Sequence, residues 1–266
     1  MFWTRLISGV VLVLLALIFV ISGGKVLLAA TAAISMIGLF ELYRALKIHD
    51  KPMGIVGYAA AIAYFGLLWT ADTEYMMLVF IGLLMVCMTI YVVTFPKYQT
   101  EEVTGAVFGL FYVPVMLSYL YQTRQMPDGA YLVWLIFISS WGCDTCAYCV
   151  GMLFGKHRLA PVLSPKKSVE GAVGGVLGAA LLGLLYATFF QDNMLNVEDP
   201  QLACALACGI AAVISQIGDL AASAIKRNHG IKDYGHLIPG HGGILDRFDS
   251  MIFTAPAIFF AVSFLK

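Results

Sequence analysis

The sequence predicts an all-α integral membrane protein, a polytopic bundle of about nine transmembrane helices. Of its 266 residues, 61% are hydrophobic and only 12% are charged, whereas soluble domains average about 25% charged residues. Apolar runs long enough to cross a bilayer, which takes about 20 residues, recur along the whole chain. This composition excludes an ordinary soluble enzyme, a disordered chain and a basic nucleic-acid-binding protein, so no nucleic-acid partner is expected.

Each predicted span is an apolar run bounded by charged or turn-forming residues. The first run follows Arg5 and is similar to a signal peptide. A second apolar run follows within a few residues, so we expect the first to be retained as a span. The expected spans lie near residues 5–22, 26–46, 53–70, 76–95, 103–122, 131–153, 169–190, 202–225 and 251–265.

The basic residues are distributed unevenly between the two sides that these spans define. Thirteen Lys and Arg residues fall with the N-terminus and the even-numbered loops, and three fall on the other side. Because cytoplasmic loops are enriched in Lys and Arg, we expect the N-terminus and these loops to be cytoplasmic. The three exceptions are Lys25, Arg124 and Lys266.

Polar residues are also distributed unevenly along the chain. Residues 1–130 have short loops and are expected to be lipid-facing scaffold helices. Residues 131–266 carry two longer cytoplasmic loops, 154–168 and 226–250, and are expected to hold the catalytic region. In the second part, Cys143, Cys146 and Cys149 form a C-x-x-C-x-x-C run that is open to a soft-metal interpretation. We favour small, buried helix-packing residues, because no second C-x-x-C completes a zinc site.

Two carboxylates lie where apolar residues are expected. Asp144 and Asp219 each interrupt a predicted span, where a charged side chain costs roughly 2.5–3.5 kcal/mol on insertion scales. Asp219, Ser223, Lys226 and Arg227 are spaced i, i+4, i+7 and i+8, so they share one face of a helix. We interpret this stripe as part of a functional site at the cytoplasmic end of that helix.

The following loop has the residue types of a phosphate and metal site. Asp246 and Asp249 are spaced i, i+3 at the head of the last predicted helix, and Mg²⁺ binds through one or two carboxylates together with substrate phosphates. Glycine-rich turns allow close approach to phosphate oxygens. The cations expected to neutralise these oxygens are Lys226, Arg227, Lys232 and Arg247.

A third polar cluster precedes the seventh predicted span. Ser164-Pro165-Lys166-Lys167 adds two cations on the same side of the membrane. The glycines that follow it form small-x-x-x-small pairs, which predict close helix packing. Together, the three clusters predict phosphoryl or nucleotidyl transfer at the cytoplasmic face, with an apolar substrate that arrives through the bilayer.

The stretch from Ser223 to Asp249 resembles the signature of the phosphatidate cytidylyltransferases, also called CDP-diacylglycerol synthases. The resemblance rests on Ser223, Lys226-Arg227, Lys232-Asp233, His241-Gly242-Gly243 and Asp246-Arg247-Phe248-Asp249. Asp144-Thr145-Cys146-Ala147-Tyr148 and Ser164-Pro165-Lys166-Lys167 are similar to two further family segments. Val169 stands where a Trp is common in the family, and residues 1–130 match only in hydropathy.

This resemblance implies that CTP and phosphatidate react to give CDP-diacylglycerol and pyrophosphate, as a step of phospholipid biosynthesis in the bacterial inner membrane. It implies Mg²⁺, as one or two divalent or mixed cations, held by Asp219, Asp246 and Asp249. Lys226 and Arg227 join these carboxylates as catalytic residues. The oligomeric state is left open, a homodimer included. The residues expected to bind substrate are Ser223, Lys232, His241, Arg247, Lys166, Lys167 and Asp144.

Two other classes of function remain as alternatives. One is another membrane enzyme that uses a nucleotide and a lipid, such as a CTP-dependent lipid-alcohol kinase or a CDP-alcohol phosphotransferase. The Asp-Gly-x-x-Ala-Arg core of the latter does not occur in this sequence. The other alternative is a cation or phosphate transporter that uses Asp144 and Asp219 as midplane sites. A transporter would need polar gating residues in its outer loops. The outer loops predicted for this chain are short and contain few polar residues of that kind.

Overall fold

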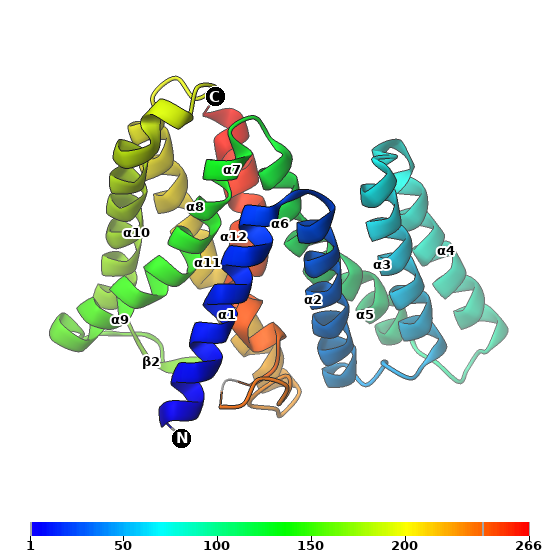
Figure 1. Ribbon diagram of the computed structural model, residues 1–266. Helices are drawn as coiled ribbons and strands as arrows, with labels where there is room; N and C mark the ends of the chain where they lie inside the picture. Colours follow the sequence, from blue (N-terminus) through cyan, green and yellow to red (C-terminus); the bar gives the residue numbers. More distant parts are fainter. Residues whose placement is uncertain (1, 241, 266) are drawn as a thin grey trace. The chain divides into compact units, whose positions relative to one another are not determined.

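The computed structural model describes residues 2–240 and 242–265, and the side chains from Ile7 onward. It confirms the predicted all-α polytopic fold, with helical runs over each of the predicted spans (Figure 1). The helices are α1 Phe2–Ser22, α2 Gly24–Ala45, α3 Pro52–Thr70, η1 Thr73–Tyr75, α4 Met76–Val93, α5 Thr100–Leu110, η2 Phe111–Val115, α6 Met116–Gln125, α7 Gly129–Leu132, α8 Trp134–Phe137, η3 Ile138–Gly142, α9 Cys143–Phe154, α10 Val169–Phe190, η4 Gln191–Asn193, α11 Pro200–Asn228 and α12 Leu245–Phe264.

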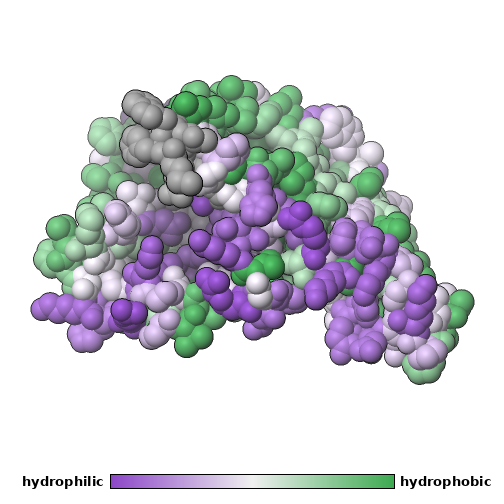
Figure 2. All heavy atoms as spheres, turned by 90° about the horizontal axis from the view of Figure 1, so that it is seen from below, coloured by the Kyte–Doolittle hydropathy of each residue, from purple (hydrophilic) through white to green (hydrophobic). Residues whose placement is uncertain are grey.

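Within the described residues, eight helical stretches are long and apolar enough to cross a bilayer. They begin with α2 and end with α12, and successive short helices join into single stretches, as in Thr100–Gln125 and Gly129–Phe154. In α1 the apolar part with described side chains is shorter, Ile7–Ser22. Figure 2 shows hydrophilic residues gathered over one end of the helices, which is where the charged loops lie.

Local sequence signals explain several helix boundaries. Pro52 occupies the first turn of α3, where its missing N–H costs no hydrogen bond. Gln99 and Glu102 form a reciprocal capping box at the start of α5. Pro114 lies in the π-helical segment η2, because proline removes one rung of the α-helical hydrogen-bond ladder.

The structure corrects the predicted boundaries at the two long loops. The loop 154–168 contains a two-stranded antiparallel sheet, β1 Arg158–Ala160 and β2 Ser164–Ser168, where only loop was expected. The loop 226–250 is shorter than predicted, because α11 extends to Asn228 and α12 begins at Leu245, ahead of the apolar span expected near 251–265. Asp246 and Asp249 therefore lie at the head of the last helix, as predicted. A span predicted from hydropathy stops at the last apolar residue. The helix itself continues through polar residues that are favourable at its ends, such as Asp246 in the first turn of α12, where a negative charge is stabilised.

The chain divides into two compact units that are not sequential halves. One unit comprises Met1–Ser118 and His229–Arg247, and the other comprises Tyr119–Asn228 and Phe248–Lys266. The division expected from the sequence, 1–130 and 131–266, followed polarity along the chain. The polar loop after α11 belongs to the same compact unit as the N-terminal helices, and the division of the chain by polarity stays a prediction.

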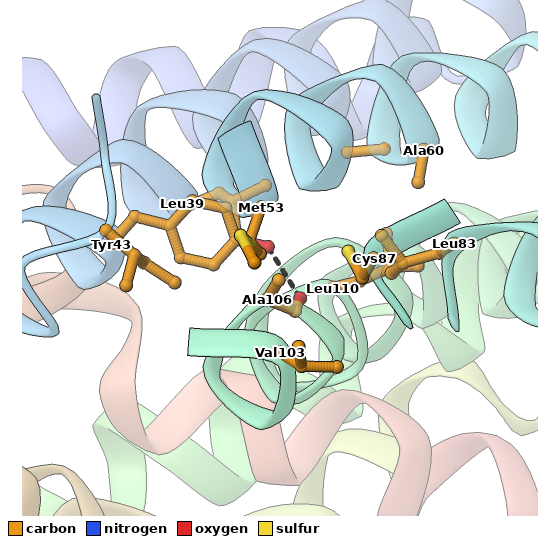
Figure 3. Packing of buried hydrophobic residues seen from close by; sticks show 11 residues of the cluster. Leu39, Tyr43, Met53, Ala60, Leu83, Cys87, Val103, Ala106 and Leu110 are labelled. Atoms are coloured by element: carbon orange, nitrogen blue, oxygen red, sulfur yellow. Dashed lines mark hydrogen bonds between the residues drawn. The ribbon is translucent and has the colours of Figure 1, made fainter. Parts of the chain in front are cut away.

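In the first unit, α2, α3, α4 and α5 enclose a core centred on Tyr43 (Figure 3). The Tyr43 ring is fully buried, and its hydroxyl donates to the carbonyl of Ala106 at 2.6 Å. The ring fits between α3 and α5 because Gly57 and Gly109 face it, and a Cβ at either glycine would overlap the ring. The C-terminal part of α2, which carries Tyr43, is therefore fixed in position by this core.

In the second unit, α10 lies between α9 and α11 and packs closely on both (Figure 1). Cβ atoms added at Gly174, Gly175 and Gly178 would lie 2.5–3.0 Å from side chains of α9. This confirms the predicted close helix packing. Cys143 and Cys146 contact these glycines, as the packing interpretation requires. For Cys149 that interpretation was wrong, since Cys149 is exposed.

Gly174→Ala tests this packing, because the added methyl would lie 2.6 Å from three carbons of Val150. We expect the variant to lose about 1–3 kcal/mol of stability from overpacking. Gly209→Ala is the matched control, since its methyl would meet Ala180 at an ordinary 3.6 Å. The readout is the thermal unfolding midpoint of each purified variant in detergent. Equal midpoints for the two variants would contradict tight packing of α9 on α10.

Candidate functional site

The 229–244 loop, which joins α11 to α12, folds back on itself within the first unit. The backbone N–H of Ile238 donates to the carbonyl of Gly242 at 2.8 Å and closes a tight turn. Gly240 and Gly242 have φ values of 78° and 89°, in the left-handed region that favours glycine. These two glycines therefore shape this turn. His241, predicted to bind substrate, lies outside the described residues.

The folded loop lines an open polar pocket of about 510 Å³, within the range of about 300–1,000 Å³ that is usual for small-molecule sites. Lys232 and Arg247, both predicted to bind substrate, are brought together in its wall. The two side-chain cations share this wall with the glycine backbone at Gly240 and Gly242. Cationic side chains beside exposed backbone N–H groups suit the binding of phosphate oxygens. The other lining residues are Asp233, His236, Ile238, Gly240 and Gly242.

Asp246 occupies the first turn of α12 and binds the loop backbone. One of its carboxylate oxygens, Oδ2, accepts the N–H of Tyr234 at 2.8 Å and the N–H of Gly243 at 3.0 Å. Charge-assisted hydrogen bonds of this kind hold a carboxylate in one orientation. Asp246 therefore links the start of the loop to its end.

Sequence reasoning missed two residues that contact the loop from α2. Glu41 accepts backbone N–H groups of Ile244 and Leu245, and Arg44 donates to the carbonyl of Tyr234. Glu41 interrupts the predicted span 26–46 just as Asp144 and Asp219 interrupt theirs. The same criterion, a carboxylate within an apolar run, therefore points to Glu41 as well.

The second unit holds a separate cluster of charged side chains around Asp219 in α11. The Nζ of Lys167, on β2, donates directly to Asp219 Oδ2. Both side chains are only about a quarter exposed, at 28% and 26%. Adjacent strand residues point to opposite faces, so Lys167 faces Asp219 whereas Lys166 is exposed.

Asp249, one turn into α12, belongs to the same cluster. Its charge interacts with those of Asp219, Lys226 and Asp144. Its Oδ1 accepts the backbone N–H of Ser250 at 2.8 Å. Three carboxylates and two lysines, predicted from three distant stretches of sequence, are thus brought into one neighbourhood of this unit.

The other predicted residues lie on α11. Ser223 is one turn beyond Asp219 and half-buried, whereas Arg227 is exposed near the end of the helix. The confirmed helix places Asp219, Ser223, Lys226 and Arg227 on neighbouring turns, as the spacing predicted.

The carboxylate cluster has suitable donor chemistry for a hard cation. Among the residues that the structure describes, no three His, Cys, Asp or Glu side chains converge as ready metal ligands. Mg²⁺ does not need such a cage, because it usually takes one or two carboxylates plus water and substrate phosphates. Lys167 already brings a positive charge to Asp219, which shows that this position attracts a cation.

Comparison with known proteins identifies a family that matches nearly the whole chain. A family model described as "Cytidylyltransferase family" matches residues 3–265. The chain belongs to the cytidylyltransferase family. The family assigned from the resemblance is therefore confirmed, and so is the expectation that the chain is an enzyme, a nucleotidyltransferase of the membrane.

Several curated members of the cytidylyltransferase family are similar over nearly the whole chain. A phosphatidate cytidylyltransferase of Staphylococcus haemolyticus is 31% identical over 261 residues, and one of Staphylococcus saprophyticus is 31% identical over 264 residues. A phosphatidate cytidylyltransferase of Staphylococcus aureus is 29% identical over 264 residues. Each alignment covers 96% of this chain and 96% of the relative. The family likeness therefore includes the N-terminal helices, which the resemblance had matched only in hydropathy.

Lys167→Ala tests whether the partner of Asp219 takes part in the family's cytidylyl transfer. We expect turnover of CTP to fall about 10- to 100-fold, the loss typical for removal of one charge-assisted hydrogen bond. Lys156→Ala, which removes an exposed cation from the same hairpin region, is the control and should keep normal turnover. Equal turnover in the two variants would show that Lys167 acts only as a charged surface residue.

Proposed function

We propose that this chain transfers the cytidylyl group of CTP to phosphatidate, giving CDP-diacylglycerol and pyrophosphate at the cytoplasmic face of the bacterial inner membrane. The observation that carries the proposal is the polar cavity beside α12, whose wall contains Lys232 and Arg247. The relatives named phosphatidate cytidylyltransferase, similar over 96% of the chain, support the choice of lipid substrate. The apolar helices would let a diacyl lipid reach the protein from the bilayer.

Within this proposal the cavity binds CTP. Lys232 and Arg247 contact the triphosphate, because Lys supplies a compact charge and Arg a bidentate fork for phosphate oxygens. Asp233 and His236 line the same cavity and supply hydrogen-bonding groups for the nucleotide. Ser223 and His241 stay predicted substrate contacts.

Mg²⁺ is proposed as the cofactor, with Asp219 and Asp249 as the carboxylates that hold it. Their charges interact within one unit, and hard oxygen ligands suit this ion. Bound there, Mg²⁺ would supply Lewis-acid stabilisation of phosphate oxygens. Lys167 donates to Asp219 and the charge of Lys226 interacts with that of Asp249, so both lysines would balance the remaining charge of these carboxylates. The assignments of Asp246 as a third ligand, of Arg227 as catalytic, and of Lys166 and Asp144 as substrate contacts stay predictions.

The reaction needs no general base, because a phosphate monoester is already an anion at neutral pH. An oxygen of the phosphatidate phosphate attacks the α-phosphorus of CTP and forms a new P–O bond. The bond from the α-phosphorus to the oxygen that bridges to the β-phosphate breaks, and pyrophosphate leaves with that electron pair. The cationic side chains hold the reacting phosphates in line and offset the charge that develops on their oxygens.

The proposed orientation of the protein in the membrane rests on the distribution of its basic residues. Thirteen of the 16 Lys and Arg residues lie with the N-terminus and the even-numbered loops, and these loops include β1, β2 and the 229–244 loop. The preference of basic loops for the cytoplasm supports a cytoplasmic position of the cavity, on the side where CTP is made.

The proposal is tested by turnover of labelled CTP with the purified protein in detergent–lipid micelles, with phosphatidate and Mg²⁺ each omitted in turn. We expect lipid-extractable label and pyrophosphate only when all three are present. Transfer of label or phosphate to a lipid alcohol, without need for phosphatidate, would replace the proposal with the kinase or phosphotransferase class. Folded protein that shows no turnover but carries ions across vesicles would favour a transporter.

Alanine at Asp249, Asp219 or Asp246 should lower this turnover by at least about 100-fold while membrane insertion stays normal, because each carboxylate is expected to help hold the Mg²⁺ that offsets phosphate charge. Asp72→Ala removes an exposed carboxylate between α3 and α4 and serves as the control. Near-normal turnover of Asp219→Ala or Asp249→Ala would remove that residue from the proposed Mg²⁺ site.

Alanine at Lys232 or Arg247 should raise the KM for CTP about 10- to 100-fold, since each removes a charged contact to the triphosphate. The KM for phosphatidate should change much less. Lys97→Ala, which removes a cation beside Tyr98 in the same unit, is the matched control. An unchanged KM for CTP with a raised KM for phosphatidate would assign the cavity to the lipid headgroup.

A further inference from the structure

Glu41 is a carboxylate placed where α2 would otherwise be apolar. It lies within the membrane-length helix Gly24–Ala45 and is only 4% exposed. A buried carboxylate without hydrogen-bond donors is strongly unfavourable, so its presence implies a specific partner. That partner is the backbone where the 229–244 loop enters α12.

The contact between Glu41 and this backbone is close and uses both oxygens. Oε1 accepts the N–H of Ile244 at 3.1 Å, and Oε2 accepts the N–H of Leu245 at 2.8 Å. These N–H groups stand at the N-terminal end of α12, where no preceding turn supplies carbonyl acceptors. Gly235 and Gly243 lie against the same carboxylate, and a Cβ at either position would overlap it. The carboxylate of Glu41, on α2, thus caps the N-terminus of α12, a role that a neighbouring residue in the sequence usually has.

Arg44, one turn later on α2, extends the same contact. Its guanidinium donates to the carbonyl of Tyr234, a residue whose side chain is buried. The N–H of Tyr234 in turn donates to Asp246 Oδ2 at 2.8 Å. One helix therefore holds both ends of the loop, and Asp246 connects those ends.

The helix that makes these contacts is itself fixed in position. Tyr43 is two residues beyond Glu41, so it points to a nearly opposite side of α2. That side is locked into the core of α3 and α5 by the buried Tyr43 ring (Figure 3). On the loop side, a Cβ at Gly38 would lie 3.7 Å from Leu245, so α2 and the start of α12 also pack closely one turn earlier.

From this geometry we infer that Glu41 and Arg44 are positioning residues for cytidylyl transfer. They fix the loop whose cavity wall contains Lys232 and Arg247, and they set the orientation of Asp246. The inference rests on the proposed function of this loop, and it gives the N-terminal helices, expected to be scaffold, a direct part in forming the site. Neither residue needs to touch substrate.

The test compares Glu41→Gln and Glu41→Ala with Glu102→Gln. The control removes a carboxylate of the same unit that pairs with Lys51 at 2.8 Å and does not contact the loop. We expect Glu41→Ala to lower kcat/KM for CTP at least about tenfold and to raise the KM for CTP, because the loop is proposed to hold the nucleotide. Glu41→Gln should recover part of the loss, because the amide oxygen still accepts one of the two N–H bonds. Glu102→Gln should match wild type in both quantities.

Hydrogen–deuterium exchange of the full chain in detergent gives a readout that is independent of activity. Peptides that cover residues 234–247 should exchange faster in both Glu41 variants and in Arg44→Gln, whereas peptides of α3 and α5 should not. General unfolding of Glu41→Ala would accelerate exchange everywhere, and Glu41→Gln and Arg44→Gln then decide the question. The inference is overturned by Glu41→Gln and Arg44→Gln variants that keep wild-type exchange and kinetics.

These outcomes separate the inference from the proposed function. If the loop does not bind CTP, Lys232→Ala and Arg247→Ala remain active, and faster exchange in the Glu41 variants then shows ordering of the loop alone. If the loop binds CTP but Glu41 does not position it, the Lys232 and Arg247 variants lose activity and the Glu41 variants do not.

Discussion

The carboxylate of Glu41 accepts two backbone N–H groups at the start of α12, and much of the polar end of this protein depends on that buried interaction. The first N–H groups of a helix have no acceptor in a preceding turn, so where they are shielded from water another group must accept their hydrogen bonds. Glu41 meets this need from α2, and the requirement fixes where the 229–244 loop ends. The glycines at 235 and 243 are then required by space, since a side chain at either would displace the carboxylate.

A related constraint governs the second unit, where carboxylates gather beside α11. The charges of Asp219 and Asp144 both act unfavourably on Asp249, and like charges in a poorly solvated region are tolerated only when cations offset them. Lys167 and Lys226 supply that balance. The cluster is thus a place where positive charge is favourable, which is the property that a divalent ion and its phosphate ligands require. Nucleotidyl transfer uses the same property, because its transition state concentrates negative charge on phosphate oxygens.

Close packing of the helices supports both clusters. In the second unit the glycines of α10 let α9 approach closely, so the helix that carries Asp144 is held against the helix that follows β2 and Lys167. In the first unit the Tyr43 ring has the same effect, because Gly57 and Gly109 make room for it. Lipid tails are as apolar as the surfaces of the helices, so the hydrophobic effect does not drive helices together within the membrane. Close packing and polar contacts therefore decide which helices associate.

The sequence by itself determined the all-α membrane fold, the approximate span of each helix and the family. Hydropathy and charge are local properties, and the stretch from Ser223 to Asp249 carries its pattern without reference to the rest of the chain. Because hydropathy is a local property, it does not reveal every element. The helix α12 begins six residues before its apolar run, and the hairpin of β1 and β2 has no hydropathy signal. Tertiary structure alone decided that Lys167 pairs with Asp219 and that Lys232 and Arg247 share a cavity. It also decided that Glu41 caps a helix 203 residues away. Contacts of this kind depend on which helices pack together, and that choice follows from shape and buried hydrogen bonds that no single stretch of sequence contains.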